Sequence, residues 1–144
     1  MIKRQLYLLF LFLACAGCSE RVDKIEYIEF DNDCVVFQAN GGELFIYPTD
    51  RDAIVDVSEA TISPSFGVSS FSAFIGPGES TNPDFEISNE WLTVVFESAR
   101  SDGRTKRIRL SATINETLQE RKATVTFNAA ALTSGKFYVT QNAK

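Results

Sequence analysis

The sequence predicts an all-β domain built as a two-sheet β-sandwich. Apolar and polar residues alternate with a period of two, most clearly over residues 107–114 and 123–128. Clusters of turn-forming residues separate short apolar segments at regular intervals, which is typical of sandwiches. Beyond Cys18 no segment has the 3.6-residue apolar period of an amphipathic helix, so we expect few helices.

The first half of the domain predicts strands with long connections. Residues 24–30 alternate apolar and acidic side chains and predict an edge strand. The turn cluster Asn40-Gly41-Gly42-Glu43 separates two apolar segments, at residues 35–37 and 44–47, and predicts a hairpin that ends at Pro48. Residues 53–57 predict the next strand. The stretch 58–84 is rich in serine, glycine and proline and predicts one or two strands joined by long loops.

The last third gives the clearest strands. Residues 91–96 are rich in β-branched and aromatic side chains. Residues 106–114 alternate, with Ile108, Leu110, Ala112 and Ile114 on the buried side. A turn at 115–120 leads to a strand at 123–127, and residues 137–140 close the sheet.

The first eighteen residues predict a lipoprotein signal. Lys3 and Arg4 precede an apolar run too short to span a bilayer, and the run ends in Cys15-Ala16-Gly17-Cys18. A cysteine after Ala-Gly resembles the acylated first residue of mature bacterial lipoproteins. We expect cleavage before Cys18, with Cys15 as a poorer acceptor and an ordinary cleaved signal as the alternative. Residues 1–17 are then the signal peptide, 18–33 a lipidated tether and 34–144 the sandwich domain.

Charge and cysteine content restrict the partners. Removal of residues 1–17 takes away two of the 14 basic residues and none of the 19 acidic ones, which leaves a net charge of about −7. Such a charge repels phosphate backbones and argues against nucleic acid as a partner. With Cys18 acylated, Cys34 has no intrachain partner, and its apolar neighbours predict a small buried core residue.

The order of motifs resembles the BACON family. The residues that carry the resemblance are the Asn40-Gly41-Gly42-Glu43 turn, the strand led by Trp91, the segments 112–117 and 121–127, and the ending Tyr138-Val139-Thr140-Gln141. The resemblance covers about residues 33–142 and implies an immunoglobulin-like β-sandwich, common in surface and periplasmic lipoproteins of Bacteroidetes. It also implies binding of carbohydrate or mucin, or service as a spacer. The stretch 50–90 is longer and more loop-like than the family pattern.

The chain lacks the residues for most catalytic sites. It has no histidine, which excludes Ser-His-Asp and Cys-His arrangements and histidine-bearing zinc sites. Asp31-Asn32-Asp33 lacks the glycine and distal glutamate of a calcium loop. Asp84, Glu86 and Glu90 are the acids to consider for glycoside hydrolysis, although solvated strand and loop faces explain them better. We therefore expect no enzyme activity, no metal and no cofactor.

Exposed aromatic residues are the candidates for glycan binding, because their rings stack on the apolar faces of sugars. The candidates are Phe71, Phe74, Trp91, Tyr47 and Tyr138. The competing interpretation for each is a place in the core.

These observations predict a non-catalytic lipoprotein that is anchored through Cys18 in the outer membrane, on the cell surface or facing the periplasm. We expect it to bind carbohydrate or glycoprotein within a surface assembly. The alternatives are a structural spacer or assembly subunit that contacts a surface-complex protein and, less favoured, a glycan-active enzyme.

Overall fold

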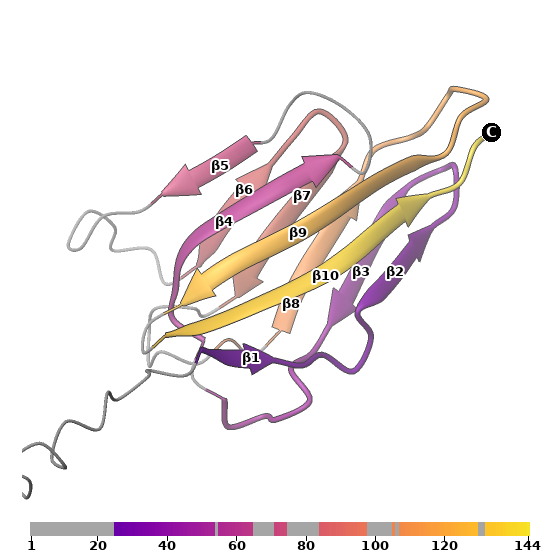
Figure 1. The fold of residues 1–144 in the computed structure, drawn as a ribbon. Coiled ribbons are helices and arrows are strands. Elements are labelled where there is room, and N and C mark those ends of the chain that lie inside the picture. The colour runs from indigo at the N-terminus through magenta and orange to yellow at the C-terminus, as the bar shows by residue number, and fades with distance from the viewer. Residues whose placement is uncertain are drawn as a thin grey trace, which may run out of the picture.

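The computed structural model describes residues 25–53, 55–64, 71–74, 84–97, 105, 107–129 and 132–144, without the side chains of residues 64 and 71–74. Over these ranges the chain forms ten strands and no helix, arranged in two sheets that face one another (Figure 1). The prediction of an all-β, two-sheet fold is confirmed. The predicted signal peptide and Cys18 lie outside the described residues.

The larger sheet has six strands in the order β1-β10-β9-β4-β5, with β2 also paired to β10. These strands are β1 (Glu26–Ile28), β2 (Cys34–Phe37), β4 (Val57–Pro64), β5 (Phe71–Phe74), β9 (Arg121–Ala129) and β10 (Thr133–Gln141). β9 is antiparallel to both β4 and β10, whereas β1 and β2 are parallel to β10. β1 pairs with residues 133–135 and β2 with residues 138–141, so the two short strands lie one after the other along the same hydrogen-bonding edge of β10.

The smaller sheet has four antiparallel strands in the order β3-β8-β7-β6. They are β3 (Gly42–Ile46), β6 (Phe85–Ser88), β7 (Leu92–Glu97) and β8 (Arg107–Ala112). The alternation predicted for β8 is confirmed, since Ile108, Leu110 and Ala112 are buried. Ile114 was expected on the same side, but β8 ends at Ala112 and Ile114 is exposed.

The core lies between the sheets and contains a connected series of aromatic rings. Phe85 and Phe96 come from the four-stranded sheet, Phe127 and Phe137 from the six-stranded sheet, and Phe30 from the segment before β2. Each ring meets the next edge to face, with 5.0 Å between the ring centres of Phe96 and Phe127. Such pairs add about 0.5–1.5 kcal/mol each beyond the area they bury.

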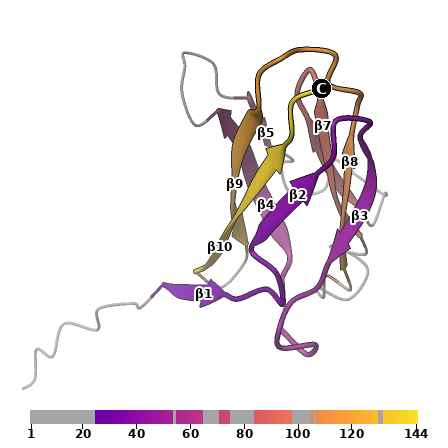
Figure 2. The same ribbon diagram turned by 90° about the vertical axis from the view of Figure 1, so that its right-hand side faces the viewer.

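The predicted hairpin at Gly41 and Gly42 is wrong. β2 belongs to the six-stranded sheet and β3 to the four-stranded sheet, so the chain crosses between the layers at this turn (Figure 2). Both glycines have positive φ, +73° and +128°. A Cβ at Gly41 would lie 2.2 Å from the carbonyl oxygen of Ala112, so this crossing requires glycine.

Two further expectations fail in the first half of the domain. In the predicted strand 53–57, Ala53, Val55 and Asp56 lie outside any strand and β4 begins only at Val57. The carbonyl of Val55 accepts a hydrogen bond from Thr105 Oγ1 at 2.9 Å instead of joining a ladder. Cys34 is not in the core: alternation along β2 turns Val35 and Phe37 inward and leaves Cys34 exposed.

Candidate functional site

The outer surface of the six-stranded sheet carries the most accessible tyrosines among the described residues. Tyr27 of β1 is 76% exposed and Tyr138 of β10 is 42% exposed. Both point away from the core, because their neighbours Ile28, Phe137 and Val139 face it. We call this surface the tyrosine face; it comprises Tyr27, Cys34, Val36, Thr124, Thr126, Asn128, Ser134, Lys136, Tyr138 and Thr140.

The surroundings of Tyr138 follow from strand register. Cys34 of β2 lies opposite Tyr138 on one side and Thr124 of β9 on the other. Register partners on neighbouring strands point to the same side of a sheet and lie about 5 Å apart. The ring of Tyr138 is therefore bordered by a thiol and a hydroxyl group.

Lys136 is the cation nearest to Tyr138. Its Nζ lies 5.5 Å from the centre of the tyrosine ring, as expected for residues two apart on one side of a strand. No carboxylate among the described residues forms an ion pair with Lys136. The lysine can therefore leave the ring without breaking a salt bridge.

Tyr47, another predicted candidate, lies at the edge of the four-stranded sheet and is 38% exposed. The guanidinium of Arg51 lies 4.7 Å from the centre of its ring. Arg51 is fixed by Asp31, whose Oδ2 lies 2.5 Å from Nη2. One face of the Tyr47 ring thus has a cation that is held in place by a carboxylate.

The outer surface of the four-stranded sheet is dominated by paired charges. Glu97 accepts hydrogen bonds from Arg107 and Arg109, and Arg109 also contacts Glu43. Burial alone would raise the pKa of Glu97, but the two arginine hydrogen bonds and charges outweigh it and lower that pKa. Arg107 in turn lies 4.2 Å from the centre of the Phe45 ring. The charged side chains of this surface are paired with one another, so few of them are available to bind a ligand.

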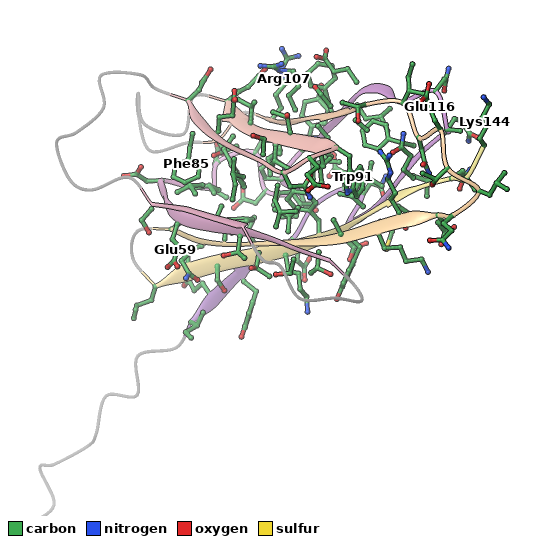
Figure 3. The ribbon with its side chains drawn as sticks, turned by 90° about the horizontal axis from the view of Figure 1, so that it is seen from above. Glu59, Phe85, Trp91, Arg107, Glu116 and Lys144 are labelled. Carbon is green, nitrogen blue, oxygen red and sulfur yellow. The ribbon has the colours of Figure 1, made fainter. Side chains whose placement is uncertain are left out.

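Trp91 lies toward the end of the sandwich that carries Glu116 and Lys144, whereas Arg107 projects from the outer side of the four-stranded sheet (Figure 3). The indole is partly buried and packs against the core, with the guanidinium of Arg121 6.0 Å from its centre. Arg121 Nη1 is also 3.5 Å from Gln141 Oε1. The indole of Trp91 therefore covers the core at the end of the sandwich that carries Glu116 and Lys144.

Phe71 and Phe74, the remaining predicted candidates, belong to the edge strand β5, and their side chains lie outside what the structure describes. Register alone places Phe74 opposite Glu59 of β4. The five predicted aromatic residues therefore do not form one cluster. Tyr138, Tyr47 and Trp91 lie on three different parts of the domain.

Sequence reasoning missed Tyr27. It lies on the same side of the sheet as Tyr138, opposite Ser134 of β10. The alternation in residues 24–30 fits two registers, one burying residues 25 and 27 and the other burying 28 and 30. The structure has the second, with Phe30 in the core and Ile28 packed against it.

The chemistry of the described residues is limited. Partial desolvation and then the neighbouring Asp33 carboxylate raise the pKa of the exposed Cys34 thiol, which disfavours the reactive thiolate. No group of three or more acidic or cysteine side chains in the described ranges is arranged to hold a metal ion. The same ranges contain no apolar helix of membrane-spanning length.

Comparison with known proteins gives a fold likeness. No family model and no curated protein matches the chain. An NMR structure of a protein from Bacteroides thetaiotaomicron superposes with a TM-score of 0.50 at 14% identity, covering 90% of this chain and 98% of that one. A Bacteroides ovatus GH5 xyloglucanase in complex with a XXXG heptasaccharide aligns with a TM-score of 0.45 at 18% identity, over 81% of this chain and 18% of the enzyme. The first likeness concerns the fold alone.

Proposed function

We propose that this chain is a non-catalytic, lipid-anchored domain of the bacterial cell envelope that binds a glycan or glycoprotein on its tyrosine face. The observation that carries the proposal is the pair of exposed tyrosines, Tyr27 and Tyr138, on a sheet surface lined by threonine and serine hydroxyls. Aromatic rings stack on the apolar faces of pyranoses, and hydroxyl and amide groups exchange hydrogen bonds with sugar hydroxyls.

The proposed anchor and fold family rest on the sequence. The apolar leader and Cys18 support lipidation, and the Gly41-Gly42 turn with the closing strand supports an immunoglobulin-like sandwich of the BACON type. The arrangement of the ends is compatible with this: β1 begins at one end of the sandwich, and the C-terminus lies at the other (Figure 2). A domain tethered before β1 in the outer membrane would hold the tyrosine face along its side.

Glycan binding is tested with the purified domain, residues 19–144, on glycan arrays and by affinity electrophoresis against polysaccharides and mucins. We expect binding that is lost in Tyr138→Ala and retained in Tyr47→Ala, which removes a tyrosine of similar exposure elsewhere. Absence of binding across diverse glycans would contradict the proposal. The anchor is tested separately: Cys18→Ser should release the protein from the membrane fraction, and mass spectrometry should find acyl chains on residue 18 of the wild type.

A second candidate function, contact with a neighbouring protein, is favoured by one feature. Leu118 is 86% exposed in the loop between β8 and β9. The loop is held by Asn115, whose side chain bonds the carbonyls of Gln119 and Asn142. An apolar side chain presented on a fixed loop suits a protein contact. Cross-linking in cells from position 116, an exposed residue of the same loop, would capture a neighbour if this function holds, and Leu118→Asp should abolish the product.

A further inference from the structure

We propose that the tyrosine face binds an extended, uncharged glycan that lies along β10, with Tyr27 and Tyr138 stacking against different sugars of the same chain. This inference rests on the function proposed above and adds the class and direction of the ligand. The ligand class is a linear β-1,4-linked chain of pyranoses with equatorial substituents. Such sugars expose flat C–H faces, and the chain forms a ribbon that can follow a sheet surface.

The spacing of the two tyrosines requires a ligand longer than one sugar. Tyr27 lies opposite Ser134, and Tyr138 follows four positions later on β10. At the usual rise along a strand this separates the two positions by roughly 13 Å. A single pyranose cannot reach both rings, whereas a short oligosaccharide can.

The groups between the tyrosines suit hydroxyl-bearing ligands. Ser134 and Lys136 of β10 face outward there, opposite Asn128 and Thr126 of β9. The amide of Asn128 is oriented by Glu59, with 3.4 Å between Nδ2 and Oε2. These side chains provide donors and acceptors in a row parallel to the proposed glycan.

Charge favours an uncharged glycan over a polyanionic one. The whole chain has a net charge of −5. On the neighbouring strand β9, Lys122 is paired at 3.1 Å with Glu120, which directly precedes that strand. Lys122, the register partner of Thr140, also faces outward, so Lys136 is the one outward cation of β9 and β10 that no described carboxylate pairs with. The acidic protein around it repels a polyanion.

Lys136 covers one face of the Tyr138 ring and must leave it for a sugar to stack on that face. An exposed cation–π contact is weak, and no carboxylate in the described ranges holds this lysine. The corresponding cations elsewhere are fixed, Arg51 by Asp31 and Arg121 by Gln141. Tyr138 is therefore the ring whose cation is displaced at the least cost.

The test is a calorimetric titration of residues 19–144 with β-1,4-linked gluco-oligosaccharides of one to six units. We expect affinity to rise with chain length and then level off once both tyrosines are spanned. Tyr27→Ala should weaken binding of the hexamer by about tenfold and leave the dimer unchanged. Tyr138→Ala should weaken both. Lys136→Ala should bind at least as well as the wild type.

The outcomes separate this inference from the function on which it rests. Glycan binding that depends on Tyr138 but not on Tyr27 or chain length would overturn the extended mode and leave glycan binding intact. Silence on every glycan tested would overturn both. Tyr47→Ala serves as the matched control, and unfolding curves for each variant show whether a lost signal reflects a lost fold.

Discussion

The ring of Phe127 in β9 lies over Gly135 in β10, its register partner across the antiparallel pair. A Cβ built at Gly135 would lie 2.2 Å from Cζ of that ring. Phe127 also meets the rings of Phe96, in the four-stranded sheet, and of Phe30, in the segment before β2. The absence of a side chain at position 135 therefore allows the aromatic series to cross the core.

Gly135→Ala should destabilise the domain. The added methyl group must displace Phe127, and overpacking of this kind costs about 1–3 kcal/mol. Urea unfolding should show a lower midpoint with an unchanged slope. Ser134→Ala is the matched control on the outward side of the same strand and should stay within about 0.5 kcal/mol of the wild type. A Gly135→Ala protein as stable as the control would show that the ring does not need this space.

The alternation of apolar and polar residues predicted the buried side of a strand correctly where only one register fits the sequence. The alternation of residues 107–112 and 123–127 places one set of side chains inward, and β8 and β9 follow it. It was insufficient where two registers fit, as at Tyr27, because a slip of one residue exchanges the two sides of a strand. Alternation also says nothing about which strand pairs with which. The crossing at Gly41 depends on Ala112, more than seventy residues away, and no short-range signal carries that information.

The sequence likewise predicted only part of the candidate site. Sequence reasoning identified Tyr138 and Tyr47 as candidates, and both are exposed. It could not distinguish them, because they differ in how the cation above each ring is held. The cation above Tyr138 is Lys136, two residues earlier on the same strand. The cation above Tyr47 is Arg51, which is paired with Asp31, a residue twenty positions before Arg51. Placement of Tyr27 beside β10 required the parallel pairing of β1, which arises from tertiary structure alone.

Asn115→Ala should loosen the end of the sandwich away from β1. The Asn115 side chain is fully buried, donates to the carbonyls of Gln119 and Asn142, and accepts from the amide of Thr117. Its removal deletes these hydrogen bonds of a fully buried side chain, each worth about 0.5–1.5 kcal/mol. Thermal unfolding measures the loss, and hydrogen exchange should show faster exchange of the Thr117 amide.

The exposed neighbour provides the control for that loop. Glu116→Ala removes a side chain of the same loop that lies in solvent, and it should leave both stability and exchange nearly unchanged. Equal effects of the two substitutions would contradict a structural role for the Asn115 amide.

Cys34 should react with thiol reagents in the folded protein, contrary to the expectation of a buried cysteine. The thiol is exposed on β2, so a maleimide should label it fully without denaturant. Its pKa is raised by partial desolvation and by Asp33, so labelling at neutral pH should be slower than for a free cysteine and should accelerate as pH rises. Asp33→Asn should increase the rate at neutral pH. Labelling that requires urea would contradict the placement of Cys34 on the surface.

Glu97 should make the stability of the domain depend on pH in the acidic range. The folded state lowers the pKa of this carboxyl, because hydrogen bonds from Arg107 and Arg109 outweigh the effect of burial. A depressed folded-state pKa stabilises the fold at any pH above the ordinary glutamate value of about 4.3, and that contribution disappears as pH falls through the folded-state pKa. Glu97→Gln should therefore lower the free energy of unfolding at pH 7, and the difference from the wild type should shrink toward pH 3.

Glu86→Gln is the matched control, because Glu86 is exposed on the adjacent strand β6 and should show a much smaller difference at both pH values. A Glu97→Gln deficit that stays constant from pH 7 to pH 3 would mean that shape and hydrogen bonding, rather than the carboxylate charge, stabilise this surface.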